Sequence, residues 1–201
     1  SDWSSDVCSS DLLATSHSIV VSNLATTSSH YSNQLASSST TISAGSFSLQ
    51  VGSGAATTIT VGSGTDTLDT LAANINSRSL GVRASVITDA NGARLSLVSE
   101  TSGSAGQVTI SGNTSGLTFT QASAGTNANL TVNGVPISNA TNTVDGAIAG
   151  VTLNLVGISA TAVTVSISQD VDKAKEAVNE FVTSYNAVIQ DRKSTRLNSS
   201  H

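Results

Sequence analysis

Histidine is the side chain that most often does acid–base or metal chemistry near neutral pH, and the sequence contains three of them. His17 and His30 lie in a segment without cysteine or acidic residues, and the next acid along the chain is Asp66. A zinc site needs at least three converging protein ligands. Two histidines without a further ligand therefore predict no metal site, and we interpret both as surface or turn residues.

Serine is abundant, but its spacing does not match that of a catalytic nucleophile. A nucleophile elbow needs the pattern Gly-x-Ser-x-Gly on a strand-to-helix turn. Gly52-Ser-Gly54 and Gly62-Ser-Gly64 lack that spacing, and they also lack the Lys-Ser/Thr ending of a phosphate-binding loop. These glycines are typical of turns.

Four carboxylates near the end of the chain could suggest a metal site: Asp170, Asp172, Glu176 and Glu180. On a helix, however, they would lie opposite an apolar stripe, where water and the helix dipole account for them. We therefore predict no catalytic residue, no metal ligand and no cofactor, and we predict that the protein is not an enzyme.

The two ends of the chain are expected to be non-native. Residues 1–12 and 191–201 are translations of the two complementary strands of one DNA segment, which we identify as a sequencing-library adapter. Segments of this origin are excluded from reasoning about the fold. The exclusion removes the only cysteine, the only tryptophan, one histidine and three bases, namely Cys8, Trp3, His201, Arg192, Lys193 and Arg196.

Charge is scarce and unevenly placed. Only 10% of the residues are charged, against about a quarter in ordinary domains, and the segments 13–65 and 101–144 contain none. The net charge of −5, with no basic cluster, excludes a nucleic-acid binder, and no apolar run is long enough for a membrane span. An uncharged, hydroxyl-rich surface suits packed extracellular assemblies, and regular apolar spacing argues against the alternative of a disordered linker.

The elements that this pattern predicts are mostly strands. Alternation predicts strands over 46–51, 58–61, 82–86, 95–97, 108–110 and 117–119, and Asn-Gly turns predict hairpins around Gly92 and Gly134. A helix is predicted over 67–80, capped by Thr67 and ended by Gly81. We also expect two helical turns over 144–148 and a strand pair of 151–155 with 163–167, whereas 24–35 fits a helix and an extended chain equally. The predicted fold class is α+β, mainly β.

The last segment changes to a helical pattern. From Asp170, a plausible N-cap, apolar residues recur with the heptad gaps 3, 4, 3, 4 and 3, at Val171, Ala174, Val178, Phe181, Tyr185 and Val188. These six residues are the predicted subunit-packing stripe, and Val182 and Ile189 widen it. The pattern fits both a coiled coil and an ordinary amphipathic helix. Its partner is expected in a missing C-terminal portion, in 13–44 or in another copy.

Several segments, taken together and in order, resemble the flagellar hook-associated protein 2 family, which caps the flagellar filament. They cover nearly all of 13–190. The segments that carry the resemblance are 20–25, 45–52, 67–76, 80–86, 94–99, 128–135, 138–144, 149–155 and 170–186.

The resemblance implies a structural protein that forms a cap of several copies at the filament tip and helps exported flagellin to polymerise. Its partners would be flagellin and copies of itself, with a host surface glycoprotein as a possible adhesive target, and with no nucleic acid or membrane. It would lie outside the cell, on the flagellum. The implied organisation is a leg or connector over 13–44, β-rich heads over 45–126 and 127–169, and the start of a returning leg helix over 170–190.

Two other interpretations stay open from the sequence. One is a different flagellar axial protein, such as a flagellin, a junction protein or a hook protein. The other is a β-rich bacterial surface adhesin, which would need exposed aromatic residues; outside the two ends the chain has only Phe47, Phe119, Phe181, Tyr31 and Tyr185.

Overall fold

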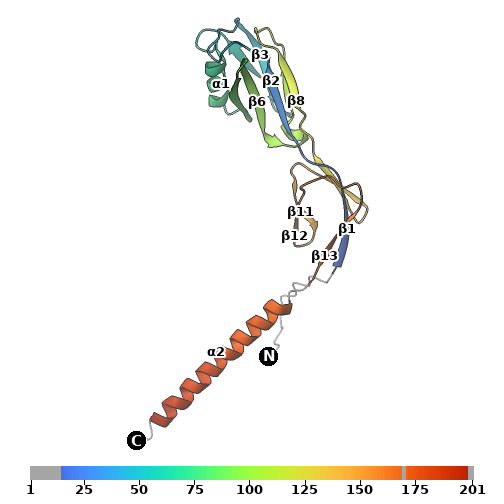
Figure 1. Cartoon of the computed structure of the whole chain (residues 1–201), viewed down its shortest axis with the longest axis vertical. Helices are drawn as coiled ribbons and strands as arrows, with labels where there is room; N and C mark the ends of the chain where they lie inside the picture. The colour runs from blue at the N-terminus through green and yellow to red at the C-terminus, as the bar shows by residue number, and fades with distance from the viewer. Residues whose placement is uncertain (1–14, 169–170, 199–201) are drawn as a thin grey trace. The chain divides into compact units, whose positions relative to one another are not determined.

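Figure 1 shows the computed structural model, which describes residues 15–168 and 171–198. The described residues form thirteen strands and two α-helices, so the fold class is α+β and mainly β, as predicted. The chain divides into two compact units, of which one is His17–Thr164 and the other includes the last helix. Each is described by itself.

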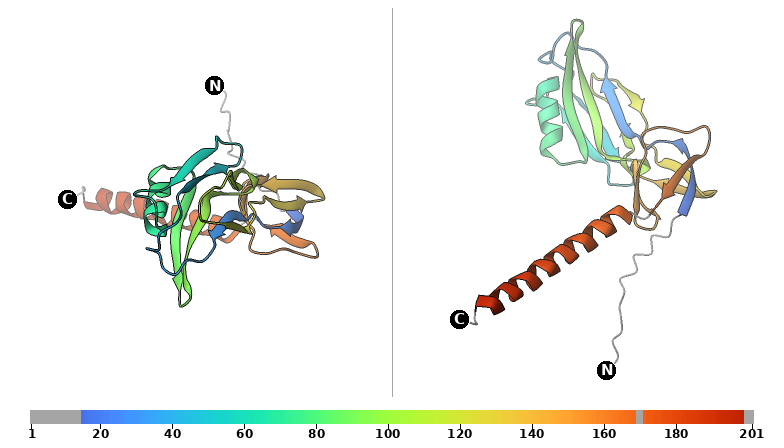
Figure 2. Two further views of the ribbon diagram at one scale, coloured as in Figure 1. Left: turned by 90° about the horizontal axis from the view of Figure 1, so that it is seen from above. Right: turned by 60° about the horizontal axis from the view of Figure 1, so that its bottom comes forward.

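The first group of strands, which we call the head lobe, contains two sheets and a helix. One sheet has the order β5-β6-β2-β8 and the other β4-β3-β7. Their elements are β2 (Thr27–Ser32), β3 (Gly45–Val51), β4 (Thr57–Val61), α1 (Leu68–Ser77), β5 (Val82–Asp89), β6 (Gly92–Ser102), the short 3-10 helix η1 (Ser104–Gly106), β7 (Val108–Ser111) and β8 (Phe119–Ser123). Figures 1 and 2 show α1 lying against β5 and β6.

The predicted apolar faces form the core of the head lobe. Phe47 and Leu49 of β3 are buried, as are the helix residues Leu68, Leu71 and Ile75. They pack with Ile59, Val61, Leu95, Leu97, Val108 and Leu117 in one cluster. The period-two and helical patterns are confirmed here because most of the residues that they place inward are buried. The others, Val51, Val86, Ile110 and Phe119, are partly buried against the same cluster.

Helix α1 has the predicted start and a different end. Thr67 caps it: its hydroxyl accepts from the backbone N–H of Thr70 at 3.2 Å, and the Thr70 hydroxyl reaches back to the Thr67 N–H. The helix ends at Ser77, and Ser79 takes the left-handed conformation with φ 51°. The expected stop at Gly81 was therefore two residues late.

The second group of strands, which we call the second lobe, contains a sheet of order β10-β9-β1-β13 and the hairpin β11-β12. Its strands are β1 (Thr15–Asn23), β9 (Ala128–Val132), β10 (Val135–Asn139), β11 (Thr143–Ile148), β12 (Val151–Asn154) and β13 (Val163–Ile167). The predicted Asn-Gly hairpin joins β9 and β10, with Asn133 and Gly134 both at positive φ.

Two local predictions in this lobe were wrong. The expected helical turns over 144–148 are strand β11, in which Val144 and Ile148 are both buried. Two extra residues, Gly146 and Ala147, stand between the pairs Asp145–Thr152 and Ile148–Val151, so the helix-like spacing reflects a bulge. The expected pair of 151–155 with 163–167 does not form, because β12 pairs with β11 while β13 lies beside β1.

The segment 24–35, left undecided between helix and extended chain, is extended. Within 13–44, β1 joins the second lobe and β2 joins the head lobe. Along β2 the buried positions are polar, namely Ser28, His30 and Ser32. The apolar residues that suggested a helix therefore did not mark the buried face.

Candidate assembly surface on the last helix

The surface that the sequence predicts for subunit packing lies on α2 (Val171–Asn198). No glycine or proline interrupts this segment, and alanine, glutamate, lysine and glutamine favour helix. Asp170, the expected N-cap, lies outside the described residues. The helix includes the segment from Asp191 whose non-native origin stays a prediction.

Four members of the predicted stripe are exposed on α2. The exposed fractions are 61% for Val178, 70% for Phe181, 58% for Tyr185 and 59% for Val188. The flanking Val182 and Ile189 are exposed as well. Val171 and Ala174 also belong to α2, although their side chains lie outside the described set. A continuous row of large apolar side chains is unusual on a permanently solvent-exposed surface and indicates an interaction site.

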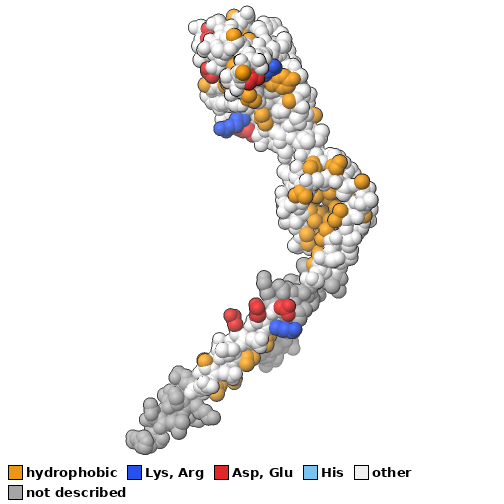
Figure 3. All heavy atoms as spheres, in the orientation of Figure 1, with side chains coloured by type: hydrophobic (Ala, Val, Ile, Leu, Met, Phe, Trp, Pro, Cys, Tyr) orange, Lys and Arg blue, Asp and Glu red, His pale blue; other side chains and the backbone are white. Residues whose placement is uncertain are grey.

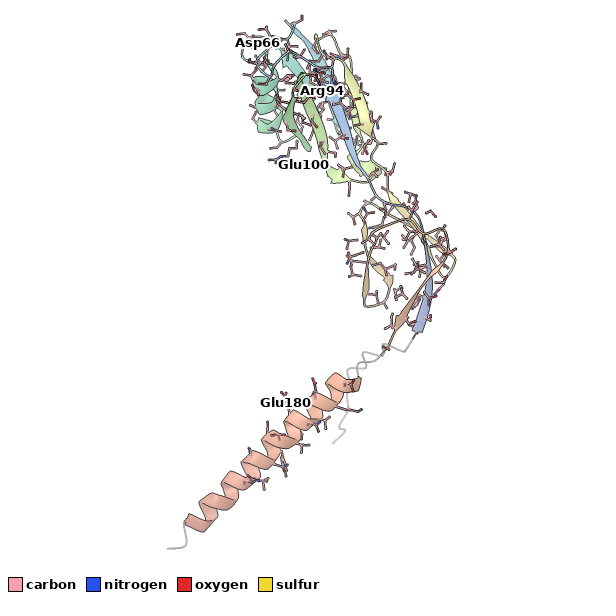
Figure 4. The ribbon with its side chains drawn as sticks, in the orientation of Figure 1. Asp66, Arg94, Glu100 and Glu180 are labelled. Atoms are coloured by element: carbon pink, nitrogen blue, oxygen red, sulfur yellow. The ribbon has the colours of Figure 1, made fainter. Side chains whose placement is uncertain are left out.

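The stripe and the charged residues lie on different sides of α2. Figure 3 shows acidic side chains along one side of the helix and hydrophobic ones along another, and Glu180 is labelled in Figure 4. The Lys175 ammonium lies 3.9 Å from the Asp172 carboxylate, and both side chains are highly exposed. Such a pair contributes little stability. The separation of charge from apolar surface is the amphipathic pattern of a helix that packs on a partner.

The two aromatic residues of the stripe lie together. The ring centroids of Phe181 and Tyr185 are 6.3 Å apart, with the ring planes inclined by 25°. Adjacent aromatic side chains one helical turn apart present a broad apolar area with few torsion angles to fix on binding. This arrangement can bury surface against another protein, and it offers no group for bond-breaking chemistry.

The described residues, 15–168 and 171–198, contain no group of three or more histidine, cysteine, aspartate or glutamate residues that could hold a metal ion. Within the same residues, no helix is both long enough and apolar enough to cross a membrane.

The interpretation of His30 as a surface or turn residue was wrong. It lies in strand β2 with an exposed fraction of 8%, and its Nδ1 atom has no hydrogen-bond partner. Burial lowers the pKa of His30, because transferring an imidazolium from water into the lobe is unfavourable. His17 is half-buried in β1 and lies 3.1 Å from the Asn133 amide nitrogen.

We expect His30 to make the head lobe less stable in acid. Because its pKa is lower in the folded than in the unfolded chain, the unfolded chain takes up the proton first as the pH falls below about 6.5. The free energy of unfolding in urea should therefore decrease between pH 7.5 and pH 5.5. His30→Leu and His30→Gln should both flatten this dependence, although they differ in packing. An unchanged pH dependence in both variants would show that His30 does not cause it.

One shallow hollow lies on the outer face of the head-lobe sheet. It is bordered by Ser29, His30, Tyr31, Ile87, Arg94, Ser96 and Ala122. The Arg94 guanidinium lies 5.6 Å from the Tyr31 ring centroid and donates to the Gln34 side-chain oxygen at 2.9 Å. The basic group of this hollow, labelled in Figure 4, is therefore engaged within the protein. We see no converging set of groups for a ligand.

Comparison with known proteins shows which families and solved structures this chain resembles. The family model described as "Flagellar hook-associated protein 2 C-terminus" matches residues 125–200, and the "Flagellin hook IN motif" matches residues 46–101. FliD (HAP2) from Pseudomonas aeruginosa PAO1 superimposes with a TM-score of 0.70 at 27% identity, over 88% of this chain and 90% of that one. In sequence and in fold the chain is similar to the flagellar hook-associated protein 2 family.

Two other relatives show how much of the hook-associated protein 2 architecture is present. The D1-D2-D3 structure of the Escherichia coli flagellar cap protein FliD matches with a TM-score of 0.72 and 27% identity, over 90% of this chain and 67% of that one. Flagellar hook-associated protein 2 of Salmonella typhimurium is 43% identical over 63 residues, which are 31% of this chain and 13% of that protein. This family is structural, not enzymatic.

Sequence reasoning missed a second exposed apolar region. Val156 is 95% exposed and Ile158 is 72% exposed, and both lie in the loop between β12 and β13. The available signal was the uncharged run 155–167, which is rich in valine, isoleucine and alanine.

Proposed function

We propose that this chain is part of a flagellar filament cap that assembles from several copies and promotes flagellin polymerisation at the filament tip. The observation that supports the proposal most directly is the exposed stripe on α2. Its aromatic and β-branched residues could be buried against an apolar surface of another subunit. Similarity to the flagellar hook-associated protein 2 family supports the place of action, the flagellum. Export from the cell and assembly outside it belong to the same proposal.

The scarcity of charge supports assembly from identical copies. Copies of a highly charged surface repel each other when they pack closely, and that repulsion must be offset by salt or by pairing. Here 10% of residues are charged, and the acidic residues of α2 lie away from its stripe. Close approach of copies along the stripe therefore brings apolar surface together and leaves the carboxylates in water.

Binding to filament ends tests the proposed function directly. Gold-labelled chain should be found by electron microscopy at one end of uncapped flagellin filaments, and rarely along their sides. Added flagellin should then elongate the decorated ends. The matched control is the chain that carries Phe181→Asp and Tyr185→Asp, which disrupts the stripe. Decoration along the whole filament, or none at any end, would contradict the proposal.

Adhesion to a host surface glycoprotein stays a prediction from the family resemblance. Among the described residues, Phe47 and Phe119 pack against each other with their ring centroids 4.9 Å apart. The Arg94 guanidinium lies over the Tyr31 ring, and Phe181 and Tyr185 stack on α2. A glycan array incubated with the chain would measure this property separately from filament binding.

A further inference from the structure

Two asparagines of this chain are followed directly by glycine, Asn91 at the turn between β5 and β6 and Asn133 at the turn between β9 and β10. In an Asn-Gly pair the backbone nitrogen of the glycine can attack the side-chain carbon Cγ of the asparagine, because glycine has no side chain to hinder the approach. Both asparagines are exposed to water. Their hydrogen bonds differ, and these bonds decide which pair can react.

The Asn133 side chain is held against strand β1. Its oxygen accepts from the backbone N–H of Ser18 at 2.9 Å, and its nitrogen lies 3.1 Å from His17 Nδ1. Because an amide nitrogen only donates, Nδ1 is the acceptor of this bond. The Asn133 backbone N–H also donates to the Ser18 carbonyl at 2.8 Å. Turning Cγ toward the Gly134 nitrogen breaks both side-chain bonds, so attack is disfavoured at this turn.

The Asn91 side chain is not held in this way. Within residues 15–168 and 171–198 it forms no hydrogen bond, although its backbone forms two. The Asn91 N–H donates to the Asp89 carboxylate at 2.7 Å, and the Gln34 side-chain amide donates to the Asn91 carbonyl. A donor at this carbonyl draws electron density from the peptide bond that follows. The Gly92 N–H therefore loses its proton more readily, and the deprotonated nitrogen is the nucleophile.

The fold requires glycine after Asn91. Gly92 is buried and has φ 141°, a conformation that residues with a side chain rarely adopt. A Cβ atom at this position would overlap the Leu35 carbonyl oxygen. Leu35 is joined there to Ala93 by two backbone hydrogen bonds, each of 2.9 Å. Packing therefore imposes the glycine, and with it the unhindered backbone nitrogen next to Asn91.

We propose that Asn91 is a site of spontaneous deamidation and that the contacts to β1 protect Asn133. The deprotonated Gly92 nitrogen attacks Cγ of Asn91 and forms a C–N bond, and the side-chain nitrogen takes up the lost proton and leaves as ammonia. Water then opens the resulting five-membered imide at one of its two carbonyl carbons. One product is aspartate. The other is isoaspartate, in which the main chain runs through Cβ.

Both products change the turn between β5 and β6. A new carboxylate lies close to that of Asp89, which accepts from the backbone N–H of residue 91, and the two like charges repel each other. Isoaspartate also adds one methylene to the main chain beside Asp89–Gly92, the last pair of the two strands. The Gln34 contact to the carbonyl of residue 91 is then lost. Hydrogen exchange at Leu35 and Ala93 should therefore be faster in the modified chain than in the parent.

Ageing the full chain tests the assignment. The chain is kept in mildly alkaline buffer, and the peptides that contain residues 91 and 133 are followed by mass spectrometry, with electron-transfer fragmentation to distinguish isoaspartate from aspartate. In the folded protein Asn91 should react about tenfold faster than Asn133, because Asn133 must first lose two hydrogen bonds. In concentrated urea the two rates should become similar, because each asparagine precedes a glycine. The proposal is overturned if folded chains modify Asn133 as fast as Asn91, or if folding slows both reactions equally.

Two variants test the contacts themselves, with circular dichroism to verify that each is folded. His17→Ala removes one bond to the Asn133 side chain and should raise the rate at residue 133 about fivefold, with residue 91 unchanged. Gln34→Glu keeps an acceptor for the Arg94 guanidinium but removes the donor to the Asn91 carbonyl, and it should slow the reaction at residue 91 alone. An unchanged rate at residue 133 in the first variant would overturn the protection by β1. An unchanged rate at residue 91 in the second would overturn the activation of Gly92.

Discussion

Replacing Phe181 and Tyr185 of α2 by aspartate is expected to abolish assembly through the stripe without unfolding the head lobe. Both rings are largely exposed, so in the isolated chain the substitutions remove little buried surface. In an assembly the same positions would be buried, and a carboxylate there loses its hydration without gaining a partner. Aromatic anchors at interfaces each contribute about 2 kcal/mol or more. The dissociation constant should therefore rise by about 100-fold or more.

The measurement is light scattering over a concentration series, with circular dichroism to verify that helix and strand contents are retained. The matched control is Asn179→Asp with Thr183→Asp, which adds the same charge at the same spacing on the opposite side of the helix. Both control positions are exposed, so assembly should stay close to that of the parent chain. If the two double variants assembled with the same dissociation constant, the stripe would not be the assembly surface.

What the sequence could predict follows from how local each pattern is. The alternation of Phe47 and Leu49 and the helical spacing of Leu68, Leu71 and Ile75 are properties of a few adjacent residues, and all of these are buried as expected. The six-residue stripe was found in the same way, since heptad spacing survives whether or not a partner is present. Four of its members can be placed, and they form one exposed row on α2.

The parts that sequence could not predict depend on distant pairing or on polar burial. Nothing in β1 indicates that its register sets Val20 opposite Thr131, more than a hundred positions away. The inward face of β2 is polar. The Ser28 and Ser32 hydroxyls accept hydrogen bonds from the backbone N–H groups of Val108 and Leu95, respectively. A hydroxyl that replaces a backbone acceptor leaves no apolar periodicity to detect.

Truncating Phe47 is expected to have the largest effect on folding. Phe47 is completely buried in β3, pairs with Ile59 of β4, and its ring contacts that of Phe119 at a centroid distance of 4.9 Å. Phe47→Ala removes the ring from the centre of the cluster and leaves a cavity that the surrounding strands cannot fill. Such substitutions cost about 3–5 kcal/mol, a large part of the 5–15 kcal/mol that holds an ordinary domain folded.

The matched control is Phe181→Ala, which deletes the same side chain from an exposed position. Urea unfolding followed by near-ultraviolet circular dichroism should place the midpoint of Phe47→Ala far below that of the parent, with Phe181→Ala within about 0.5 kcal/mol of it. Filament-end binding should show the reverse order when it is measured at a temperature where both variants are folded. The two phenylalanine variants thus distinguish a residue that stabilises the fold from a residue that stabilises the assembly. Phe47→Ala lowers the free energy of unfolding of the single chain, whereas Phe181→Ala weakens only the association of chains. Equal loss of stability in both variants would mean that α2 is packed within the single chain, and the stripe would then be core and not interface.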